Sequence, residues 1–112
     1  MTKIFLILAA LGLPSAALAQ AIYSYNFLNI TGQATTVVRT GSGVLHSVTF
    51  NKPTATETVA MYDGSAASGT IIGTITVPAS PMPVTLTYDA AYGTSLTIVT
   101  ATASSDITVS YR

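Results

Sequence analysis

Short runs of alternating apolar and polar residues recur about every ten residues, and this pattern limits the fold more than any other feature. The clearest run, residues 70–77, sets Ile75 and Val77 against Thr76. Threonine, which is stiff at χ1 and suits a pleated surface, supplies eighteen of the residues from 20 to 112. No stretch keeps a helical period of 3.6 residues. The pattern predicts an all-β fold, an antiparallel β-sandwich of about eight short strands, either jelly-roll-like or immunoglobulin-like.

Turn residues place the boundaries of the expected strands. We expect strands over residues 22–30, 33–39, 44–50, 56–62, 70–77, 84–88, 96–100 and 107–111. Gly73 marks a bulge or a close backbone contact within its strand. Three prolines make residues 78–83 an extended connection, and residues 89–94 are expected to form a turn.

The first nineteen residues have the layout of a secretory signal peptide. A basic start is followed by an apolar run over residues 4–13, about half of the ~20 residues that a membrane-spanning helix needs. Ala17 and Ala19 then form an Ala-x-Ala cleavage pattern. We predict cleavage between Ala19 and Gln20, leaving a single β-sandwich domain over residues 20–112 that is not inserted in a membrane. The alternative is a retained hydrophobic helix or short anchor.

Composition argues against most chemistry. Charged residues make up 7% of the chain, the formal net charge is zero, and there is no cysteine. Nucleic-acid binding requires a basic field, which is missing here. One histidine and four carboxylates are scattered along the chain, so we expect no enzyme activity, no catalytic residues, no cofactor and no metal. A net charge near zero favours association, and self-association is therefore expected.

Three titratable side chains lie where the sequence suggests a specific role. His46 lies mid-strand in phase with Val44 and Val48 and is expected to be a packed residue, because the sequence shows no partner that would orient it as a base. Asp63 and Asp89 each follow a tyrosine and are expected to hydrogen-bond the backbone of the turn that comes next. A weak Ca²⁺ site at these turns is the alternative, although the loops offer few carboxylates.

An aromatic stripe lies near the start of the expected mature chain: Tyr23, Tyr25 and Phe27 fall on one face of the first expected strand. If this face points into the core, the stripe is simply part of the sandwich. If the strand instead pairs with a neighbouring subunit, the stripe belongs to an assembly strand whose aromatic side chains fill pockets in the partner. Both interpretations are structural rather than catalytic.

Several strand and turn phrases resemble small proteins of tailed bacteriophages and prophages. They are TVVRTGSGVLH (36–46), MYDG (61–64), LTYD (86–89), LTIVTA (96–101) and DITVSYR (106–112). The resemblance spans residues 23–112 and implies a virion-associated β-sandwich protein of the head-decoration or fibre type. It implies a virion or filament protein as the partner. A signal peptide would export the chain to the periplasm, cell surface or exterior, whereas an unprocessed chain would belong to a virion.

Two functions therefore emerge from the sequence. The first is a non-enzymatic structural subunit that builds or decorates a larger assembly, a phage virion surface or an exported cell-surface fibre. The second is a secreted carbohydrate-binding or adhesin module, in which exposed tyrosines such as Tyr23, Tyr62 or Tyr92 stack on sugar rings.

Overall fold

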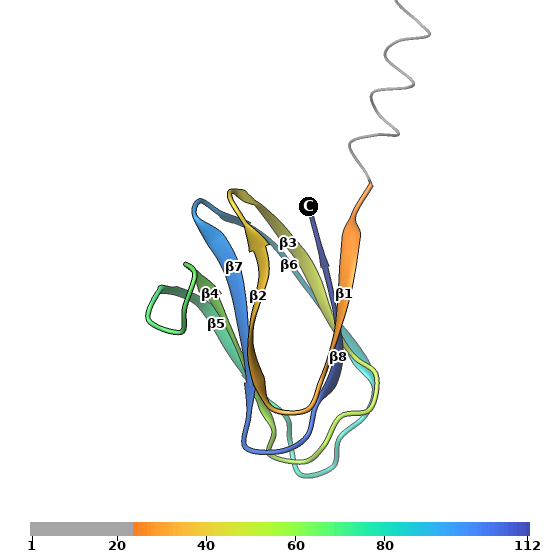
Figure 1. The fold of residues 1–112 in the computed structure, drawn as a ribbon. Coiled ribbons are helices and arrows are strands. Elements are labelled where there is room, and N and C mark those ends of the chain that lie inside the picture. The colour runs from red at the N-terminus through yellow and green to blue at the C-terminus, as the bar shows by residue number, and fades with distance from the viewer. Residues whose placement is uncertain (1–23) are drawn as a thin grey trace, which may run out of the picture.

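The computed structural model describes residues 24–112, which form eight antiparallel strands and no helix (Figure 1). The strands are β1 (Asn26–Thr31), β2 (Ala34–Thr40), β3 (Gly43–Phe50), β4 (Thr58–Asp63), β5 (Thr70–Thr76), β6 (Val84–Tyr92), β7 (Ser95–Ala101) and β8 (Asp106–Tyr111). They form two four-stranded sheets, which confirms the predicted β-sandwich.

The strand order shows which kind of sandwich this is. One sheet has the order β1-β8-β3-β6 and the other β2-β7-β4-β5. The chain therefore pairs its first strand with its last, its second with its seventh, its third with its sixth and its fourth with its fifth. This nested pairing is the arrangement of a jelly roll rather than of an immunoglobulin domain.

The core lies between the two sheets and is built from the apolar side of each alternating run. Its largest fully buried apolar side chains come from both sheets, and they are Tyr92, Phe50, Leu45, Met61, Leu96, Ile98 and Ile107. Alternation puts the threonines of the same strands outside or at the sheet margins, as expected for a half-buried strand. Thr97 and Thr100 are exceptions, since both are buried and donate their hydroxyls to backbone carbonyls.

Most expected strands agree with the structure to within a few residues, but the sixth does not. The turn predicted over residues 89–94 is wrong, because β6 continues through Asp89 to Tyr92 before the chain turns. The prediction for Gly73 is confirmed. The register between β4 and β5 shifts beside it, and a Cβ atom there would lie 3.1 Å from the Tyr88 hydroxyl oxygen.

The N-terminal predictions fall outside the described residues. The signal segment 1–19, the cleavage residues Ala17, Ala19 and Gln20, and the aromatic Tyr23 all precede residue 24. Within residues 24–112, no helix has the length and apolar character needed to cross a membrane.

Candidate interaction surface

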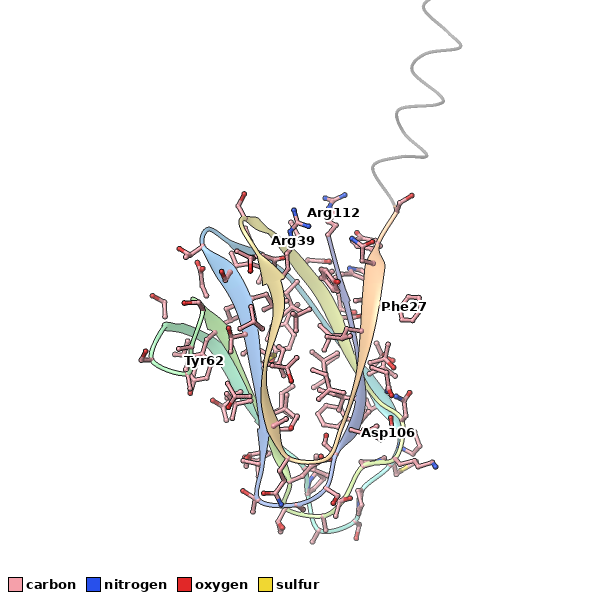
Figure 2. All side chains as sticks on the ribbon, viewed as in Figure 1. Phe27, Arg39, Tyr62, Asp106 and Arg112 are labelled. Carbon is pink, nitrogen blue, oxygen red and sulfur yellow. The ribbon has the colours of Figure 1, made fainter. Side chains whose placement is uncertain are left out.

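The outer face of the sheet β1-β8-β3-β6 carries the aromatic residues of the first strand. Leu28 and Ile30 turn toward the core, so Phe27 points outward and is 76% exposed. Figure 2 shows its ring projecting away from the opposite sheet. Tyr25, just before β1, is half-buried. The interpretation in which the stripe faces the core is therefore wrong for Phe27, because the pairing of β1 with β8 commits the alternate residues to the interior.

A polar cluster lies on the same outer face, at the end nearer the β7–β8 connection. The Asn29 amide nitrogen donates to Asp106 Oδ1 (2.9 Å) and to the Ile107 carbonyl (2.8 Å). The Asn51 amide nitrogen donates to Asp106 Oδ1 (3.2 Å) and to the Thr108 hydroxyl (3.0 Å). We call Asn29, Asn51, Asp106 and Thr108 the amide cluster.

These hydrogen bonds also set the charge state of the cluster. The Asn29 amide, followed by the Asn51 amide, lowers the pKa of Asp106 by bonding to its ionised form, and the charge of Lys52 acts in the same direction. Asp106 is therefore a carboxylate at neutral pH. No local sequence pattern indicates this cluster, because Asn29 and Asp106 are 77 positions apart and meet only when β1 pairs with β8.

A second group occupies the other end of this face. His46 Nδ1 lies 2.5 Å from Asp89 Oδ1, and the ring of Tyr25 stacks on the imidazole with centroids 4.2 Å apart and planes at 13°. The guanidinium carbon of Arg112 lies 5.4 Å from the centre of the Tyr25 ring. His46 does pack against a neighbouring ring, but it does so on the outer face rather than in phase with the buried Val48, and it has an orienting partner that the sequence did not indicate.

Two irregular pairings bring His46 and Asp89 together. On β6, both Tyr88 and Asp89 lie opposite the single residue His46, and Asp89 has a positive φ of 49°. On the other side, His46 is itself the extra residue relative to β8. Such bulges re-aim side chains. The expectation that Asp89 binds the backbone of a following turn is wrong, because its carboxylate faces β3 instead.

Asp63 does bind a turn, though not the one that follows it in sequence. Its two carboxylate oxygens accept the backbone N–H groups of Gly93 (2.8 Å) and Thr94 (2.9 Å), in the β6–β7 connection. The Gly93 bond, then the Thr94 bond, lowers the pKa of Asp63. Within the described residues, no three histidine or carboxylate side chains gather as ligands for a metal ion.

The sheets have four edge strands, which differ in how well they are protected from pairing with another chain. β2 and β5 each have a register shift against their inner neighbours, and β2 also carries Arg39. β6 carries the bulge at Asp89. β1 pairs with β8 at six consecutive positions without a shift, and its sequence NFLNIT contains neither a charge nor a proline.

An apolar groove opens on the opposite side, between the edge strands β5 and β6. Its volume is about 390 Å³, and the β5–β6 connection forms part of its wall. It is lined by Phe50, Pro53, Ile75, Thr76, Val77, Pro78, Ser80, Met82, Val84 and Leu86. Met82 is 76% exposed at this groove.

Of the tyrosines expected to stack on sugars, the two that the structure describes, Tyr62 and Tyr92, do not share an exposed surface. Tyr92 is only 2% exposed and donates its hydroxyl to the Arg112 carbonyl (3.2 Å), so it is a core residue. Its burial raises the pKa of its hydroxyl. Tyr62 is half-buried on β4, in the other sheet. The sequence pattern does not predict the burial of these two tyrosines, because Tyr suits either side of a strand.

A buried carboxylate was also missed. Glu57 has no exposed surface; its Oε1 accepts the Thr54 N–H (3.0 Å), while Oε2 has no hydrogen-bond partner among the described residues. It precedes β4 and follows Thr56, which has a positive φ of 67°. The bond from Thr54 and the bond from the Glu57 N–H to the Thr54 carbonyl (3.2 Å) fix this connection, a local role in the β3–β4 loop.

Comparison with protein-family models, with curated proteins and with solved structures found no match to this chain. The resemblance to phage proteins accordingly remains a prediction from sequence phrases.

Proposed function

We propose that this chain is a non-enzymatic structural subunit that builds or decorates a larger assembly, and that β1 is its assembly strand. The single observation that carries the proposal is the unprotected edge of β1. An edge strand exposes a row of unpaired backbone N–H and C=O groups that can pair with another chain. Proteins normally block such edges with charges, prolines or bulges, and β1 has none of these.

Two further features support association at this edge. The exposed Phe27 ring adds apolar area beside the free backbone, so pairing would remove the backbone and the near edge of the ring from water while its outer face stays open. The formal net charge of zero provides little repulsion between copies. The pairing of β1 with its own β8 is compatible with this role, because a strand has two edges and β8 occupies only one.

The sequence phrases and the N-terminal segment favour two different kinds of assembly. The phage resemblance favours a virion surface, and the signal-peptide layout favours an exported fibre. The N-terminal residue of the protein taken from its native source separates them: Gln20 would mean export, and Met1 would mean an unprocessed virion component.

Charged substitutions on the edge strand test the proposal. We expect the full chain to sediment as an oligomer, and the double variant Asn26→Lys/Thr31→Lys to sediment as a monomer, because two lysines on exposed positions of β1 oppose edge pairing. Thr35→Lys is the matched control: it places a lysine on an exposed position of the bulged β2 edge and should leave the oligomer intact. A chain that is monomeric at every concentration and adheres to no virion or filament would refute the proposal, as would equal dissociation by Thr35→Lys.

A further inference from the structure

The amide cluster presents hydrogen-bond acceptors to solvent. Both N–H groups of Asn29 and both of Asn51 are consumed within the protein. No described residue donates to Asn29 Oδ1, Asn51 Oδ1 or Asp106 Oδ2. The amide orientations are fixed by cross-strand bonds, so these three oxygens are held in place before any ligand arrives. An outside group that binds these oxygens must be a hydrogen-bond donor or a cation, and three oxygens with a single carboxylate are fewer than the six to eight that Ca²⁺ takes, which favours a donor.

Phe27 supplies an apolar surface beside these acceptors. It shares the outer face of β1 with Asn29, two residues away and about 7 Å along the strand. Its ring is 76% exposed and has no aromatic or cationic partner among the described residues. Tyr25 differs, since its ring is already engaged by His46 and Arg112. Figure 2 shows Phe27 and Asp106 on the same outer side of the sheet.

An aromatic ring next to fixed acceptors matches the chemistry of a neutral sugar. A pyranose has an apolar C–H face that packs on an aromatic ring, and a rim of hydroxyl groups that donate hydrogen bonds. The carboxylate of Asp106 disfavours an anionic ligand, because its lowered pKa keeps it charged. A second copy docking the same face would set acceptors against acceptors, so self-association at this surface is disfavoured as well.

We infer that the outer face of the sheet β1-β8-β3-β6 binds neutral glycans. The Phe27 ring stacks on a sugar, and the side-chain oxygens of Asn29, Asn51 and Asp106 accept hydrogen bonds from the hydroxyl groups of that sugar. The inference goes beyond the assembly role, since it uses the face of the sheet rather than the edge. A subunit with both features would display sugar-binding faces along an assembly.

Affinity electrophoresis of the full chain tests this site with four probes: a β-glucan, an α-mannan, a galactan and the anionic polysaccharide alginate. We expect at least one neutral polysaccharide to retard the protein and alginate not to do so. Phe27→Ala and Asn51→Ala should each weaken that retardation at least tenfold, whereas Phe27→Tyr keeps it. Val37→Ala is the control, because Val37 is also an exposed apolar residue but lies on β2 of the other sheet.

The outcomes separate this inference from the assembly proposal. Circular dichroism verifies that each variant is folded. The single edge variant Asn26→Lys places its charge at the end of β1 away from the amide cluster, so it should still bind the same polysaccharide even where it weakens the oligomer. The inference is overturned if no neutral polysaccharide retards the protein, if alginate does so equally, or if Phe27→Ala leaves retardation unchanged. It is also overturned if Phe27→Ala dissolves the oligomer and the separated protomers bind glycan as before.

Discussion

Asp63 shows how a single side chain can join the two sheets. It ends β4 in one sheet, and its carboxylate receives two backbone N–H groups from the connection that leaves β6 in the other. The turn after β6 has no side chain of its own that makes these bonds. Charge-assisted bonds of this kind stabilise the ionised carboxylate, which explains why the pKa of Asp63 is lowered.

Acid should weaken the fold through Asp63 and Asp106. Both have a pKa below the ordinary value of 3.8 in the folded protein, so their contribution to stability is complete above that value and is lost as the pH falls through the lowered pKa. We expect thermal unfolding scans to show a falling midpoint below about pH 4. Asp63→Asn and Asp106→Asn should each flatten this decline, and the double variant should flatten it further. The assignment would be contradicted if the unfolding midpoints of these variants fell at low pH as steeply as that of the parent protein.

The contacts of individual side chains were harder to predict from the sequence than the strands were. The role of Asp63 as a turn-binding carboxylate followed from its position at a strand end, but its partner turn is about thirty positions away. His46 and Asp89 lie on strands that pair only in the folded sheet, so no local pattern could have linked them. Phe27 stands out in the sequence as part of the aromatic stripe, but its outward direction depends on which side of β1 faces the other sheet.

Elements were predicted much better, because alternation and turn residues are local signals. The expected range 44–50 differs from β3 by one residue at its start, and the range 96–100 differs from β7 by one residue at each end. The failure at β6 has a specific cause. Asp89 looks like a turn residue, but a left-handed Asp within a bulge satisfies the same conformational preference without ending the strand.

Tyr25 should hold the start of β1 against the sheet. Aromatic stacking is worth about 1 kcal/mol, and Tyr25 stacks on an imidazole that Asp89 orients. Tyr25→Ala should therefore speed amide hydrogen exchange at the first residues of β1 about fivefold, without a change in β4 or β7. Tyr25→Phe, which keeps the ring, should exchange like the parent. Equal protection in the Ala variant would show that the stack contributes nothing.

For the whole molecule, the nested pairing makes β8 indispensable. β8 lies between β1 and β3 and buries Ile107 and Val109 completely. A chain ending at Ser105 should show no cooperative thermal transition by circular dichroism, since one sheet would lose its second strand and leave β1 without a partner. A chain beginning at Gln20 is the control, because every described core side chain lies after that point. A cooperative transition in the shortened chain would contradict this dependence.

The same nesting has a consequence for how the protein is made. Among the eight strands of the sandwich, β1 is synthesised before the others, and its only partner within the described residues, β8, is synthesised after them. Only the β4–β5 hairpin joins neighbours in the chain among these nested pairs. The sheet that contains β1 and β3 therefore cannot be completed until β8 is available, and the contacts that close it join segments far apart in the sequence.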